Sequence, residues 1–130
     1  MSRHSGFRTD RARALGLGAA KEGPGHWWSQ RLTSVALVPL ALLFVFPFVR
    51  ALGAPHAEVV ALYSRPFHAI VAILFIGVGF LHLQQGLQVV IEDYVHGKAL
   101  RTAALLANTL LTWAFGLAGV FAVLRIAFTA

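Results

Sequence analysis

A histidine in the middle of an uncharged, apolar stretch is the side chain of this sequence that is best placed to do chemistry. His82 lies within residues 66–91, which contain no Asp, Glu, Lys or Arg. Counted inward from Glu92 along a helix, it lies ten residues or about 15 Å deep, close to the middle of a hydrocarbon layer about 30 Å thick. An ionisable side chain at that depth is costly, and it usually faces a binding site or the interior of a helix bundle.

The neighbours of this histidine leave room for a ligand or for another helix. Gly79 and Gly86 lie on the same helix face as His82 and give it almost no side-chain bulk, and Gln85 adds a polar contact. Such a notch accommodates either a closely packed helix or a flat macrocycle such as haem. The sequence therefore leaves two interpretations open, a histidine hydrogen-bonded between helices or an axial ligand of haem.

A haem held by one imidazole in this way needs a second axial ligand. The other two long apolar runs of the chain contain no His, Cys or Met. His68 belongs to the same helix but lies about 21 Å away from His82 along it, which predicts an interfacial position for His68. If haem binds here, we expect the second ligand to come from another polypeptide.

A second polar cluster, Glu92 to His96, follows the same apolar run. Acidic residues at a helix C-terminus oppose the helix dipole, so this cluster is a candidate functional site. The Tyr94 hydroxyl could donate a hydrogen bond to a quinone carbonyl as negative charge develops on it, and Asp93 could orient the hydroxyl or relay protons. Arg31, at the same membrane face, could offset the developing charge. The alternatives are an interfacial tyrosine, solvated loop charges and an arginine that only sets topology.

Three long runs without a charged residue must position these side chains. They are residues 32–49, 66–91 and 102–124. The chain has 130 residues, of which 58% are hydrophobic and only 12% are charged. Runs of about 18 or more residues that are apolar all round are typical of membrane-spanning helices and exclude a soluble globular protein. The sequence thus predicts an all-α anchor domain over residues 26–130. Its helices are expected to span approximately residues 32–52, 66–92 and 101–125.

The distribution of charge predicts the orientation. Most of the 11 Lys and Arg residues precede the first apolar run or lie in the second loop, so the positive-inside rule places the N-terminus in the cytoplasm and the C-terminus in the periplasm. Residues 1–25 are expected to form a mobile basic arm on a bacterial inner membrane, although an Arg-rich start can also mimic an organelle transit peptide. Basic residues beside a membrane span indicate contact with lipid, and we expect no nucleic-acid partner. The chain has no Cys, which excludes iron–sulfur ligation by this chain.

Two stretches of the sequence carry a resemblance to a known family. Residues 26–34 read HWWSQRLTS and lead into the first span, and residues 82–94 read HLQQGLQVVIEDY at the end of the second. Together they resemble the hydrophobic membrane anchor subunit of succinate dehydrogenase, the smaller cytochrome b anchor of succinate:quinone oxidoreductase (complex II). The resemblance covers roughly residues 25–125.

The resemblance implies a role for each candidate residue. His82 is implied to be an axial ligand of haem b, with the other ligand on a second cytochrome b anchor subunit. Tyr94 is implied to donate a hydrogen bond to ubiquinone, with Asp93 in support. Arg31 is implied to lie near both the quinone and the haem propionates, and His26 is expected in the propionate region.

The resemblance also implies partners. Succinate would be oxidised on a flavoprotein subunit, and an iron–sulfur subunit would pass the electrons to quinone, so we expect no succinate-oxidising site on this chain. Two alternatives stay open. One is the anchor of a fumarate reductase, which works in the opposite direction. The other is a small transport or assembly protein with His82 and Asp93 in a proton path.

Overall fold

The computed structural model describes residues 23–129, and the regular elements within that range are all helices. In chain order they are α2 (Gly23–Ala51), α3 (His56–Tyr63), α4 (Pro66–Tyr94) and α5 (Lys98–Thr129). Three of them, α2, α4 and α5, are long and apolar enough to cross a membrane, which confirms the predicted all-α fold with three spans. Of the predicted N-terminal arm, residues 1–22 lie outside the described residues, and residues 23–25 form the first turn of α2.

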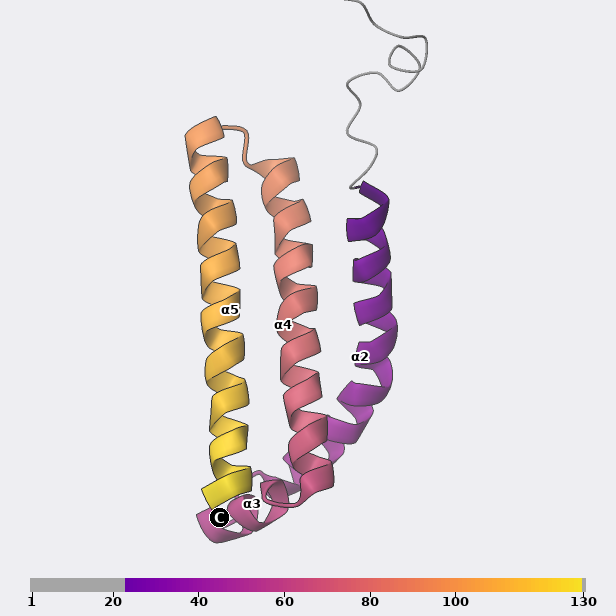
Figure 1. Ribbon diagram of the computed structural model, residues 1–130, viewed down its shortest axis with the longest axis vertical. Helices are drawn as coiled ribbons and strands as arrows, with labels where there is room; N and C mark the ends of the chain where they lie inside the picture. Colours follow the sequence, from indigo (N-terminus) through magenta and orange to yellow (C-terminus); the bar gives the residue numbers. More distant parts are fainter. Residues whose placement is uncertain (1–22, 130) are drawn as a thin grey trace, which may run out of the picture.

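The three long helices lie side by side in one layer with α4 in the middle, as Figure 1 shows. Helix α4 packs against α2 on one side and α5 on the other, and α3 contacts α4 and α5. The start of α2 and the end of α5 lie at opposite ends of the layer. This agrees with an odd number of crossings, while the cytoplasmic placement of the N-terminus stays a prediction.

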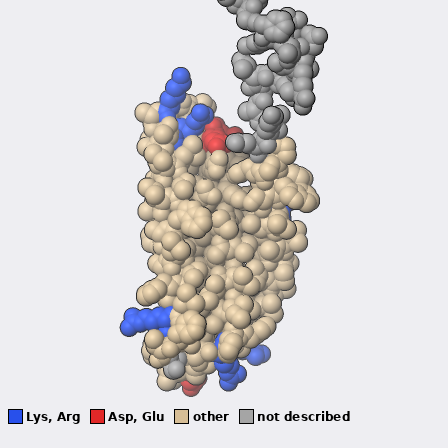
Figure 2. All heavy atoms as spheres, viewed as in Figure 1, with Lys and Arg blue, Asp and Glu red and all other residues tan. Residues whose placement is uncertain are grey.

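The surface of the layer fits a lipid environment. On the face that Figure 2 shows, charged atoms gather at the two ends and nearly all of the area between them is uncharged. Large apolar side chains of the long helices are exposed, among them Leu110 and Phe121 of α5 with 69% and 67% of their surface exposed. Such side chains need hydrocarbon or other apolar chains around them, and helices satisfy their own backbone hydrogen bonds there.

Glycine and proline shape the ends and the bend of the helices. Pro66 opens α4 in its first turn, where its missing N–H costs no hydrogen bond. Gly53, in the turn after α2, has a φ of 80°, which a residue without a side chain adopts at little cost. Helix α2 bends in its second half (Figure 1), where Pro39 and Pro47 interrupt the ladder of backbone hydrogen bonds.

Helix α3 was not predicted from the sequence. It has only eight residues, and an isolated helix of that length is unstable in water. Its last residue, Tyr63, is buried and lies against Phe44 of α2, with ring centroids 6.4 Å apart. Phe44 in turn stacks on Phe75 of α4 at 4.5 Å. Packing of Tyr63 on α2, together with the contacts of α3 with α4 and α5, therefore stabilises a helix that local sequence alone does not specify.

A close contact between α4 and α5 yields a testable prediction. A Cβ atom added to Gly116 would lie 3.2 Å from Phe80 Cβ, whereas one added to Gly77 would meet nothing within 4 Å. Gly116→Val should therefore destabilise the protein by about 1–3 kcal/mol, the usual cost of overpacking, and lower its thermal unfolding temperature in detergent. The matched variant Gly77→Val should unfold near the wild-type temperature. Equal behaviour of the two variants would show that the α4–α5 contact tolerates added bulk.

Candidate functional site

Two hydrogen bonds join α2 to α4 in the half of the layer where α2 begins. Thr33 Oγ1 lies 3.0 Å from Nδ1 of His82. One helical turn closer to the membrane edge, Gln85 Nε2 donates to Ser29 Oγ over 2.7 Å. The two helices run antiparallel, so residues spaced by four on α2 meet residues spaced by three on α4. His82, the predicted haem ligand, thus contacts α2 through Thr33. We call the four residues Ser29, Thr33, His82 and Gln85 the polar seam.

Helix α2 lies against the two glycines beside His82. A Cβ atom on Gly79 would lie 3.9 Å from Leu37 Cδ2, and one on Gly86 would lie 3.7 Å from Gln30 Nε2. These are ordinary contact distances between packed helices, so the two glycines let α2 approach α4 closely. Helix α2 is thus one neighbour of these glycines, as one of the two interpretations of the sequence allows, and Gly86 also lines the hollow described next.

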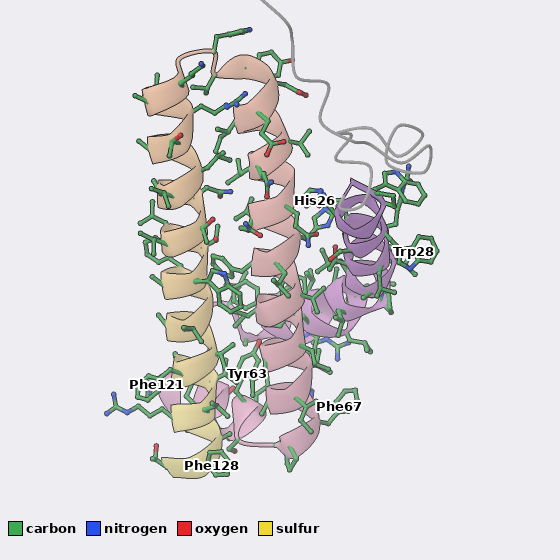
Figure 3. All side chains as sticks on the ribbon, turned by 45° about the horizontal axis from the view of Figure 1, so that its top comes forward. His26, Trp28, Tyr63, Phe67, Phe121 and Phe128 are labelled. Atoms are coloured by element: carbon green, nitrogen blue, oxygen red, sulfur yellow. The ribbon has the colours of Figure 1, made fainter. Side chains whose placement is uncertain are left out.

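A polar hollow of about 680 Å³ lies between the first turns of α2 and the last turns of α4. It is lined by His26, Trp27, Gln30, Gly86, Gln88, Val89 and Glu92. Figure 3 shows His26 on the side of α2 that faces α4, whereas Trp28 points away. His26 Nε2 and Gln30 Oε1 are buried and have no hydrogen-bond partner among the described residues. Buried polar atoms of this kind are normally satisfied, so the hollow can accept the polar groups of a ligand or of water.

The remaining candidate residues lie at the same end but on the surface of this chain. Tyr94, the last residue of α4, is 77% exposed, and Asp93 and Arg31 are exposed as well. The Arg31 guanidinium lies 5.2 Å from the centroid of the Trp27 ring, a cation–π contact that holds it near the hollow. The structure therefore brings His26 and Glu92 to one hollow, but it leaves Tyr94 and Asp93 outside that hollow.

Sequence reasoning missed the two residues of α2 that contact the predicted haem ligand His82 and its neighbour Gln85. Ser29 and Thr33 are spaced by four and face His82 and Gln85 across the interface. The available signal was a pair of small hydroxyl residues on one face at the start of a membrane span, because Ser and Thr often hydrogen-bond across membrane helices. Spacing alone, however, did not say which helix they would meet.

The chain has the features of a small multi-pass membrane subunit. It has three membrane-spanning helices in one layer, a polar seam between α2 and α4, and a hollow at one end with buried polar atoms that lack hydrogen-bond partners among the described residues. The chain matches the family model described as succinate dehydrogenase/fumarate reductase transmembrane subunit over residues 6–124. The chain belongs to this family, which confirms the resemblance found in the sequence. It is accordingly a multi-pass protein of the inner membrane and part of an enzyme complex.

Curated relatives agree with the family match. The chain is 37% identical over 119 residues, covering 92% of both sequences, to the succinate dehydrogenase hydrophobic membrane anchor subunit of Paracoccus denitrificans. It is 30% identical over 78% of its length, and 81% of the relative's, to the protein of the same name from Rickettsia bellii. It is 33% identical over 65% of its length, and 73% of the relative's, to the succinate dehydrogenase membrane anchor subunit of Reclinomonas americana. No solved structure matches the chain significantly.

Proposed function

We propose that this chain anchors a succinate dehydrogenase to the membrane, supplies one axial ligand of haem b and forms part of the ubiquinone site. The observation that carries the proposal is the position of His82, half-buried near the middle of α4, in a chain that is 37% identical to a succinate dehydrogenase anchor subunit. A histidine at this depth is costly unless it binds something. The alternative of a transport or assembly protein has no such support from the comparisons.

The imidazole of His82 fits a haem. Its Nδ1 atom is engaged by Thr33, so the contact with α2 orients the ring and leaves Nε2 as the nitrogen that can coordinate iron. When bound, haem b supplies a centre that takes up and gives back one electron. The second ligand is supplied by a second cytochrome b anchor subunit, because haem sites of this kind need two axial ligands.

Ubiquinone binds at the end of the layer where α2 begins and α4 ends. The Tyr94 hydroxyl donates a hydrogen bond to a quinone carbonyl, which becomes stronger as the carbonyl gains negative charge, and Asp93 orients that hydroxyl. Arg31 and His26 offer positive or donor groups to the quinone and to the haem propionates from the start of α2. Because Tyr94 is largely exposed on this chain, the site is completed by the neighbouring subunits.

The open layer supports a role as one subunit among several. Only Tyr63, Ala69, Val71 and Ala72 are buried apolar residues within the described part of the chain, and they lie in α3 and the start of α4. Most of both faces of the layer is therefore free to contact the second anchor subunit and lipid. The iron–sulfur and flavoprotein subunits dock at the end that carries Tyr94, since electrons must reach the quinone there.

Purification of the tagged chain from its native membranes tests this proposal. We expect flavoprotein and iron–sulfur subunits to co-purify with it, together with a haem b signal in the reduced-minus-oxidised difference spectrum. Membranes with the untagged chain serve as the control for non-specific capture. Recovery of the chain without redox subunits and without haem would contradict the proposal. Comparison of succinate oxidation with fumarate reduction by the same preparation decides between the two directions of the reaction.

A further inference from the structure

The hydroxyl of Thr33 is surrounded by three hydrogen-bonding atoms, and it has only one hydrogen to share among them. The carbonyl oxygens of Ser29 and Gln30 each lie 3.0 Å from Thr33 Oγ1. His82 Nδ1 also lies 3.0 Å from it. The two carbonyl oxygens can only accept a hydrogen bond, and a threonine hydroxyl within a helix commonly donates to a carbonyl of its own helix.

The roles of the two remaining atoms depend on where this hydrogen goes. If the Thr33 hydroxyl donates within α2, its oxygen is free to accept a hydrogen bond from His82 Nδ1, which then carries the hydrogen. In a neutral imidazole the hydrogen on one nitrogen leaves a lone pair on the other. In that arrangement, His82 is the tautomer in which Nε2 is the free, lone-pair-bearing atom.

We propose that Thr33 is a positioning residue for the haem ligand. By accepting the hydrogen bond from Nδ1, it fixes the ring orientation and the tautomer of His82 and presents Nε2 to the iron. This inference rests on the proposed role of His82 as ligand. A hydrogen bond of this kind also makes the ligating nitrogen more basic, and loss of such a partner typically weakens metal binding about 10–100-fold.

A more basic axial ligand favours the ferric over the ferrous state, because it donates more electron density to the metal. Thr33 is therefore expected to lower the midpoint potential of the haem, since hydrogen bonding around the ligand is one of the means by which a protein tunes haem. A purely structural role, in which Thr33 only helped α2 to pack on α4, would leave the potential unchanged as long as the complex assembled.

Three variants of the purified complex test this assignment. Thr33→Val keeps the shape of the side chain but removes the acceptor, and we expect a higher haem midpoint potential and haem binding weakened about 10–100-fold. Thr33→Ser restores the hydroxyl and should return both quantities to wild-type values. Ser29→Ala is the matched control, because it removes the adjacent α2–α4 hydrogen bond to Gln85 without touching His82, and it should have the wild-type potential.

Each outcome decides the matter. A wild-type potential and wild-type haem affinity in Thr33→Val would overturn the assignment, as would an equal shift in Ser29→Ala, which would assign the effect to helix packing. If Thr33→Val does not assemble, Thr33→Ala removes the same hydroxyl with less bulk and must show the same upward shift. Retention of haem by a His82→Ala complex would instead refute the proposed ligand itself, so the two failures are distinguishable.

Discussion

Complexes that carry His82→Ala should lose nearly all of their haem b. The alanine side chain offers no nitrogen to the iron, so any haem would have to be held by the ligand of the other subunit alone. Loss of a residue that only supports a metal ligand already costs about 10–100-fold in metal affinity, so loss of the ligand itself should cost at least as much. Haem per flavin in the purified complex and the reduced-minus-oxidised spectrum measure the effect.

A second histidine of α4 provides the control for this experiment. His68 lies in the first turns of the same helix, half-buried at the opposite end of the span, and His68→Ala should leave the haem content unchanged. Loss of haem in both variants would indicate general damage to α4. Wild-type haem content in His82→Ala would remove this residue from the site and leave it as a histidine that joins α2 to α4 through Thr33.

Tyr94→Phe should slow electron transfer from succinate to ubiquinone without slowing the reduction of soluble dyes by the flavoprotein. The variant removes one hydrogen-bond donor and keeps the ring. A hydrogen bond contributes about 0.5–1.5 kcal/mol net, and about 1.4 kcal/mol corresponds to a tenfold change in rate, so we expect a loss of up to about tenfold. The ratio of quinone reductase to dye reductase activity in the same preparation is the quantity to measure.

The chain has a second tyrosine that serves as the matched control. Tyr63 lies in α3 at the far end of the layer, where burial raises the pKa of its phenol and its hydroxyl has no partner within the described residues. Tyr63→Phe should keep the wild-type activity ratio. A parallel loss of both activities in Tyr94→Phe would point to failed assembly, and an unchanged ratio would show that the hydroxyl does not contact the quinone.

The notch formed by Gly79 and Gly86 shows that one sequence feature can be compatible with two different neighbours. From the sequence, the missing side chains were compatible with haem or with a helix, and in the structure Leu37 and Gln30 of α2 lie at contact distance from the two glycines. This outcome does not remove His82 from consideration as a ligand, because only its Nδ1 atom is used by α2.

The sequence by itself determined that this chain crosses a membrane with three helices, that His82 lies near mid-depth and that the candidate quinone residues lie at one membrane face. These properties are local. The length and hydropathy of a run decide whether it spans the hydrocarbon layer, and the rise per residue of a helix fixes the depth of each position. The family also follows from local motifs, since residues 82–94 carry both candidate sites.

Only the tertiary structure decided which residues meet across the helices. The contact between Thr33 and His82 joins positions 49 apart in the chain, and a shift of α2 by one turn would replace it with another pair. Such a register depends on the fit of many side chains at once, here on small residues that allow close approach, and no single stretch of sequence records it. The same reason explains why the sequence did not predict α3, because this helix depends on a tertiary contact between Tyr63 and Phe44.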